Sequence, residues 1–167
     1  MKVPFPYREV DGYLWLPLEK ALFAKLPETV TTRGMALYRK KEFHVTLAYF
    51  QALLSDAGMS DSKESLLREF SEFVAMHPVI FRTFRDDMRF ASREKKRSVV
   101  VRCEVSNVEE LFQKWETILG IKLDRQPTHV TVYTLQPEIG IGINTMEEME
   151  ALPRVDVPEI RNALGLA

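Results

Sequence analysis

The stretch FHVTLAY at residues 43–49 returns with small changes as THVTVYT at residues 128–134. Both stretches are rich in β-branched and aromatic residues, a composition typical of β-strands. Each contains His-Val-Thr followed by an aliphatic residue, at 44–47 and again at 129–132, about half the chain length apart. The recurrence predicts two strands built alike, one in each half of the chain.

A β-strand directs residues i and i+2 to the same face, so His44 and Thr46 are expected to project together, as are His129 and Thr131. Each imidazole and its hydroxyl would then be held about 7 Å apart along a rigid backbone. The residues between and after them would face the other way, into a core. Two such strands facing one another would present two imidazoles and two hydroxyls across one cleft.

The segments around these strands predict an α+β fold with mainly antiparallel sheets, because strands and helices do not alternate strictly along the chain. Periodicity and turn residues predict strands at 12–18, 34–39, 43–50, 79–84, 88–91, 98–105, 128–135 and 139–143. Helices are expected at 19–26, between Asp61 and His77, between Ser106 and Gly120, and at 145–151. No long linker interrupts this series, so residues 1–167 are expected to form one domain.

Composition narrows the class of protein. The chain has 167 residues, of which 46% are hydrophobic and 28% charged, with a formal net charge of −1; non-specific coating of nucleic acid is therefore not expected. The single cysteine, Cys103, lies in an apolar run and is expected to be a buried filler. No stretch approaches the roughly 20 apolar residues of a membrane span, and the N-terminus has no signal-peptide pattern. We therefore expect a cytoplasmic protein with no membrane attachment and no obligate protein partner.

Charge is uneven along the chain. Residues 82–102 are rich in arginine and lysine, whereas residues 138–167 are mainly acidic. Such runs indicate either two solvated faces or, for the basic run, arginines that lean toward an anionic substrate.

His44, Thr46, His129 and Thr131 match what the hydrolysis of a phosphodiester requires. A base must take a proton from water, an acid must give one to the leaving oxygen, and donors must hold the phosphoryl oxygens. Imidazole titrates near neutral pH and suits both proton transfers, and the threonine hydroxyls suit the donor role. These four residues would cover the chemistry without a metal or another cofactor.

Three other interpretations of the repeated motif remain open. Two histidines can begin a metal site, but such sites usually recruit a third ligand, and neither motif contains a carboxylate or a cysteine. A binding module would keep the cleft and recognise a nucleotide or RNA end without turnover. An interaction domain would carry both motifs for structural reasons alone. Neither a phosphate-binding loop nor a nucleophile elbow competes with these, since GIGIN at 140–144 lacks the necessary lysine and no Gly-x-Ser-x-Gly is present.

The paired motifs resemble those of the two-histidine (2H) phosphoesterase superfamily, whose mark is a pair of His-x-Thr/Ser-x motifs. The resemblance implies a bilobal fold with pseudo-twofold lobes around a central cleft, lobe one carrying 44–47 and lobe two carrying 129–132. It implies a metal-independent phosphodiesterase or 2′,3′-cyclic phosphodiesterase that acts on a nucleotide or RNA end, with His44, Thr46, His129 and Thr131 as the catalytic set. Its coverage is about residues 34–135.

The resemblance also implies residues that bind the substrate beside the catalytic set. Arg125 belongs to the run-in that precedes the second motif in many members and is expected to contact the substrate. An aromatic side chain near a motif is expected to stack on a base. Strand parity favours Tyr133, two residues after Thr131, over Tyr49, three residues after Thr46. The alternative for Tyr133 is simple packing.

Overall fold

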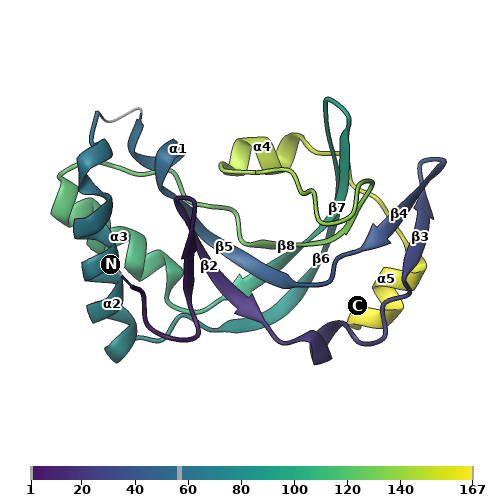
Figure 1. Cartoon of the computed structure of the whole chain (residues 1–167), viewed down its shortest axis with the longest axis horizontal. Helices are drawn as coiled ribbons and strands as arrows, with labels where there is room; N and C mark the ends of the chain where they lie inside the picture. Colours follow the sequence, from purple (N-terminus) through teal and green to yellow (C-terminus); the bar gives the residue numbers. More distant parts are fainter. Residues whose placement is uncertain (1, 56–57, 167) are drawn as a thin grey trace.

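The computed structural model describes residues 2–55 and 58–166, which fold into two antiparallel sheets flanked by helices (Figure 1). The smaller sheet has the order β1-β2-β5, with β1 at Arg8–Val10, β2 at Tyr13–Leu18 and β5 at Phe43–Tyr49. The larger sheet has the order β3-β4-β8-β7-β6. Its strands are β3 (Thr29–Thr32), β4 (Met35–Arg39), β6 (Phe81–Arg93), β7 (Lys96–Val105) and β8 (His129–Thr134). The expected α+β class with antiparallel pairing is confirmed.

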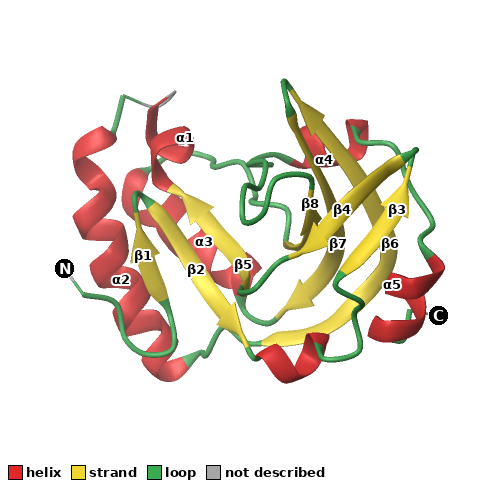
Figure 2. Ribbon diagram, turned by 45° about the vertical axis from the view of Figure 1, so that its right-hand side comes forward, coloured by secondary structure: helices red, strands yellow, loops and turns green. Residues whose placement is uncertain are grey.

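Some of the helices cover the outer sides of the two sheets. Helices α2 (Lys63–Met76) and α3 (Val108–Leu119) lie beside the smaller sheet, and the larger sheet curls into a half-barrel with α5 (Pro158–Leu164) beside it (Figure 2). Two further α-helices are short: α1 (Phe50–Ser55) continues from β5, and α4 (Met146–Ala151) follows the second motif strand. A 3-10 turn, η1, occupies Lys20–Phe23, and a second, η2, occupies Ser60–Ser62.

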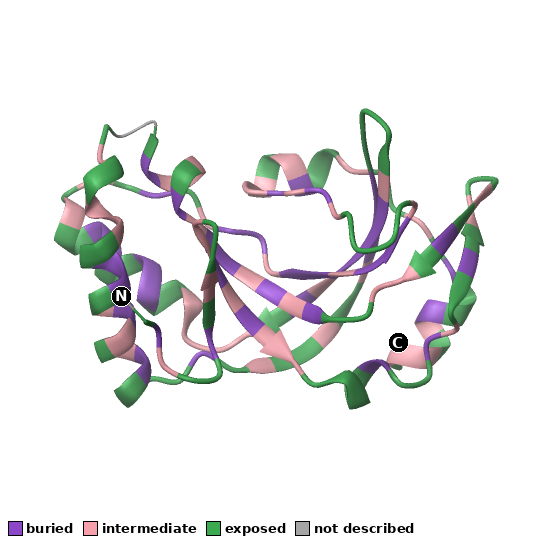
Figure 3. Cartoon of the chain, viewed as in Figure 1, coloured by how far each residue is buried: buried purple, intermediate pink, exposed green. Residues whose placement is uncertain are grey.

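One hydrophobic core joins both sheets to the inner faces of α2 and α3. Leu14 and Val45 of the smaller sheet, Phe70 of α2 and Trp115 of α3 are fully buried in it, together with Val130 of β8. Figure 3 shows this burial following the strands and the inward faces of the helices. Cys103 is also fully buried there, as expected, and burial raises the pKa of its thiol to about 12.

Two expectations about the strands are wrong. Residues 79–84 and 88–91 do not form separate strands; β6 runs from Phe81 to Arg93, with a register irregularity between Phe84 and Met88. Residues 139–143 form an irregular segment, not a strand. Both edges of β8 are already taken by β4 and β7, so this segment lies across a face of the sheet, where Ile141 and Ile143 pack in a second small core with Val100. Elements β1, β3, α1 and α5 were not anticipated.

The two motif strands share a local distortion as well as a sequence. In the β2–β5 ladder, Trp15 pairs with Thr46 but Leu14 pairs with Ala48, so β5 carries one extra residue directly after its motif threonine. In the β7–β8 ladder, Val100 pairs with Thr131 but Val99 pairs with Tyr133, which places an extra residue in β8 at the same point. A bulge of this kind reverses the alternation of faces beyond it.

Within the described residues, no helix combines the length and the apolar character needed to cross a membrane.

Candidate active site

The two motifs meet in one cavity of about 280 Å³ between the sheets. His44 and Thr46 line it from β5, and His129 and Thr131 line it from β8, so the expected convergence of the four side chains is confirmed as geometry. The other walls come from β2, from Lys40 and Gln126, and from the segment after β8. The remaining lining residues are Tyr13, Trp15, Lys40, Gln126, Glu138, Gly140, Ile141, Gly142, Ile143 and Asn144.

On the β5 side, the His44 imidazole lies flat against the Trp15 indole. The ring centroids are 4.1 Å apart with an interplanar angle of 18°. Trp15 stands beside Thr46 in the β2–β5 ladder, so the stack is set by strand register. Burial lowers the pKa of His44 to about 4, and the charges of Lys40 and His129 act in the same direction. Lys40 is the nearby cation that the motif itself does not reveal.

On the β8 side, His129 is buried and its ring orientation is fixed by a hydrogen bond. Its Nδ1 lies 2.6 Å from the carbonyl oxygen of Pro127, two residues earlier. A carbonyl can only accept, so Nδ1 carries the proton and Nε2 keeps a free lone pair. Burial lowers the pKa of His129 to about 4, the Pro127 bond opposes this shift, and the charge of Arg102 adds to it.

The two threonine hydroxyls are available to a ligand. Thr46 and Thr131 are both half-buried, and neither hydroxyl is bonded to another of the residues that the structure describes. The same holds for two buried polar atoms of cavity residues, Trp15 Nε1 and Asn144 Oδ1. Buried polar groups in folded proteins are almost always hydrogen-bonded, so these atoms suit a polar ligand.

The segment 138–144 forms one wall of the cavity, a role that the sequence does not indicate. The Gln126 side chain, just before the second motif, donates from Nε2 to the Ile143 carbonyl at 2.6 Å. A Cβ at Gly140 would lie 4.0 Å from the Thr131 methyl, and one at Gly142 would lie 3.7 Å from the Tyr13 hydroxyl, so the segment passes close to both sheets. The apolar Ile141 and Ile143 alternate with these glycines, and that alternation is the signal that imitated a strand.

The expected role of Tyr133 is wrong, because the bulge in β8 reverses the face that parity assigned. Tyr133 is fully buried in the main core, and its hydroxyl donates to the Pro27 carbonyl at 2.6 Å. The bulge in β5 has the opposite consequence for Tyr49, which it brings to the face of Thr46. Tyr49 stacks on Tyr13 with centroids 4.0 Å apart, and Tyr13 leads on to Trp15 at 6.4 Å. An aromatic row therefore runs along the smaller sheet to His44.

Arg125 also stands elsewhere than expected. Its guanidinium donates to both carboxylate oxygens of Glu109, at 2.9 and 2.8 Å, and to Glu116 at 2.9 Å, and it lies over the Phe112 ring. This bonding lowers the pKa of Glu116 to about 2. Arg125 does not line the cavity. It links the segment before the second motif to α3.

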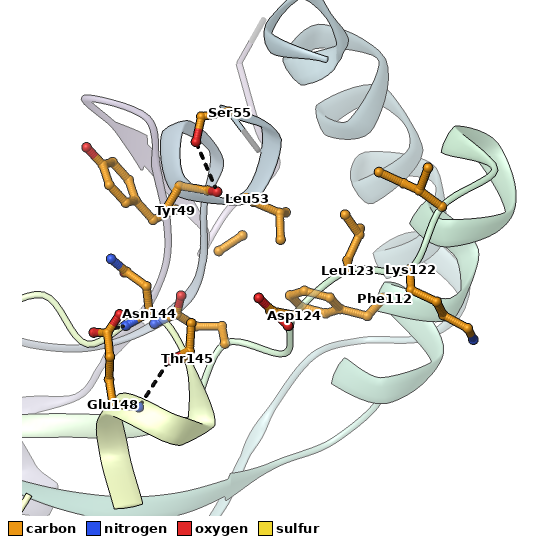
Figure 4. Close-up of a pocket in the computed structure, with 14 residues that line it drawn as sticks. Tyr49, Leu53, Ser55, Phe112, Lys122, Leu123, Asp124, Asn144, Thr145 and Glu148 are labelled. Carbon is orange, nitrogen blue, oxygen red and sulfur yellow. Dashed lines mark hydrogen bonds between the residues drawn. The ribbon is translucent and has the colours of Figure 1, made fainter. Parts of the chain in front are cut away.

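Two larger cavities adjoin the one that holds the histidines. One, of about 560 Å³, shares Gln126 and Asn144 with it; Tyr49, Leu123 and Asp124 are among its walls (Figure 4). The other, of about 770 Å³, shares Lys40 and Glu138 with it. The histidine cavity is thus the middle one of three.

The described residues contain no cluster of three or more histidine, cysteine, aspartate or glutamate side chains arranged to hold a metal ion. The third histidine, His77, is exposed at the C-terminus of α2 and does not line this cavity.

No protein-family model, curated protein or solved structure matches the chain.

Proposed function

We propose that the protein is a phosphodiesterase, or a 2′,3′-cyclic phosphodiesterase, that acts on a nucleotide or RNA end with His44 and His129 as its acid and base. One observation carries the proposal: two imidazoles and two unbonded hydroxyls, from two sheets, line a single small cavity. The set has the composition that an in-line displacement at phosphorus requires. The two sheets, each with one motif and a bulge directly after the motif threonine, fit the two lobes that the resemblance to the 2H phosphoesterases implies.

The hydrogen bond to Pro127 favours His129 as the base. With Nδ1–H held by the carbonyl, Nε2 of a neutral His129 takes a proton from water as the water oxygen bonds to phosphorus. The bond from phosphorus to the leaving oxygen breaks, and His44, in its protonated form, gives that oxygen its proton. The Thr46 and Thr131 hydroxyls hold the non-bridging oxygens.

The negative charge of a bound phosphate favours the protonated form of His44 that the proposed mechanism needs. In the unliganded protein both imidazoles have a pKa near 4, so both are neutral at pH 7. An anion placed between them favours the charged form of a neighbouring imidazole and raises its pKa. Lys40, which lines the same cavity, adds attraction for that anion.

The second candidate is a module that binds a nucleotide or RNA end without turnover. The two neutral imidazoles favour it, because hydrogen bonding to a ligand needs no proton transfer. The two candidates make opposite predictions about product formation.

The deciding experiment incubates the purified protein with 2′,3′-cyclic nucleotides and with RNA oligomers of defined ends, and identifies the position of the product phosphate. The phosphodiesterase proposal predicts turnover that His44→Ala and His129→Ala each lower by about 10²–10⁴-fold, with unchanged circular dichroism. Saturable binding of the same compounds without any product would establish the binding module instead.

A further inference from the structure

The cavity on the far side of Lys40 differs in charge from the rest of the cleft. It is lined by four basic side chains, Lys20, Arg39, Lys40 and Lys41, and by two acidic ones, Glu28 and Glu138. The cavity at the opposite end has one basic side chain, Lys122, and two acidic ones, Asp124 and Glu148. The middle cavity, with the histidines, therefore has a cationic neighbour on one side and an aromatic, mildly acidic neighbour on the other.

The cations of this cavity are free to bind a ligand. Lys20 and Lys41 are exposed, and within the described residues neither ammonium group is engaged in a salt bridge. Glu138, one of the two acids of this cavity, accepts the Lys41 backbone N–H at 2.7 Å. Arg39 donates through one nitrogen to the Leu26 carbonyl, and its other guanidinium hydrogens remain for an anion.

We infer that this cavity is a second anion subsite, which binds a further phosphate of the substrate while the scissile phosphodiester lies between His44 and His129. The inference rests on the proposed function for the scissile group. Lys40 lines both cavities and thus marks where one phosphate site gives way to the next. Lysine ammonium and arginine guanidinium groups are the usual protein partners of phosphate.

The substrate that fits these cavities is a short oligonucleotide-type chain that carries a phosphate beyond the scissile one, on the Lys41 side. Its remaining nucleoside lies toward the aromatic row of Tyr49 and Tyr13. A mononucleoside cyclic phosphate would fill the middle cavity and leave the cationic one unused.

The test compares three dinucleotides: one without a terminal phosphate, one with a 5′-phosphate and one with a 3′-phosphate. One of the two phosphorylated forms should have a kcat/KM about tenfold higher than the unphosphorylated form, the scale of one charge-assisted hydrogen bond. Lys41→Ala and Lys20→Ala should reduce this ratio toward one. Lys122→Ala, an exposed lysine in the opposite cavity, is the matched control and should keep it.

The ratio of kcat/KM values distinguishes loss of the subsite from damage to the fold, since general damage lowers activity on all three compounds. Equal kcat/KM for the three, or a preference that survives the Lys20/Lys41 double variant, would overturn the inference. If none of the dinucleotides is hydrolysed, the proposed function fails first. Calorimetric Kd values for the same compounds then decide: a tenfold preference that Lys41→Ala removes supports the subsite, and equal Kd values reject it.

Discussion

The two motif strands have nearly the same sequence but very different surroundings. β5 is at the edge of a three-stranded sheet, where His44 is half-buried and held by a flat stack on Trp15. β8 is in the interior of a five-stranded sheet, where His129 is buried and held by a hydrogen bond to Pro127. An identical motif thus yields one imidazole oriented by packing and one oriented by a bond that also fixes its tautomer. The surroundings, not the motif, make the pair asymmetric.

The largest expected effect is the fall in kcat when either histidine is replaced. It tests which histidine is the acid and which is the base. His44→Ala and His129→Ala should each lower kcat by about 10²–10⁴-fold on a substrate with an alkoxide leaving group. A p-nitrophenyl phosphodiester has a leaving oxygen that departs as a stable anion and needs no proton. This substrate should therefore restore much of the activity of His44→Ala but not of His129→Ala. Steady-state kinetics with both esters makes the comparison. Restoration in His129→Ala alone would exchange the two roles.

The next effect concerns stability as a function of pH. Both histidines have a folded pKa near 4, below the 6.5 of an unfolded imidazole. Between pH 6.5 and 4 the unfolded chain therefore binds more protons, so the free energy of unfolding should fall as pH decreases through that window. Each histidine contributes at most about 3 kcal/mol.

Urea titrations at several pH values measure this dependence. His129→Gln, which replaces the more deeply buried ring, should flatten the slope more than His44→Gln. Parallel curves for the wild type and both variants would show that neither imidazole carries the pH dependence.

A smaller effect should distinguish the two ways in which the rings are oriented. Trp15→Leu removes the surface on which His44 stacks and should lower kcat about tenfold with little change in KM, as expected of a positioning residue. Trp15→Phe keeps an aromatic face and should recover most of the loss. The loss should also shrink with the p-nitrophenyl ester, because it acts through His44. A large rise in KM with unchanged kcat would instead assign Trp15 to substrate binding.

The smallest expected effects test the sheet faces on which the two bulges place Tyr133 and Tyr49. Tyr133→Phe removes the hydrogen bond to the Pro27 carbonyl and should cost about 1 kcal/mol of stability, with kcat and KM unchanged. Tyr49→Ala removes the outer member of the aromatic row and should raise KM for a nucleotide with little effect on kcat. Denaturation curves and kinetics on both variants check this. A KM effect in Tyr133→Phe as large as that in Tyr49→Ala would contradict the assignment of faces.

The sequence by itself determined the features that depend on local pattern. Period-2 alternation placed His44 with Thr46 and His129 with Thr131, and the repeated tetrapeptide predicted that the two pairs converge. The apolar stripes predicted α2 and α3, and the mixed order of elements predicted an α+β class. Each of these follows from neighbours along the chain.

The tertiary structure decided what depends on contacts between distant segments. A bulge is a property of two paired strands, so residue parity could not foresee that Tyr133 turns into the core while Tyr49 turns to the cleft side. Residues 139–143 alternate like a strand, but the edges of β8 were already occupied, and the segment became a wall of the cavity. Arg125 bonds to carboxylates on α3. Trp15 meets His44 because β2 pairs with β5, and Lys40 shares the cavity with both histidines only in the folded chain. Local pattern sets which side chains share a strand face, but only packing sets what that face meets.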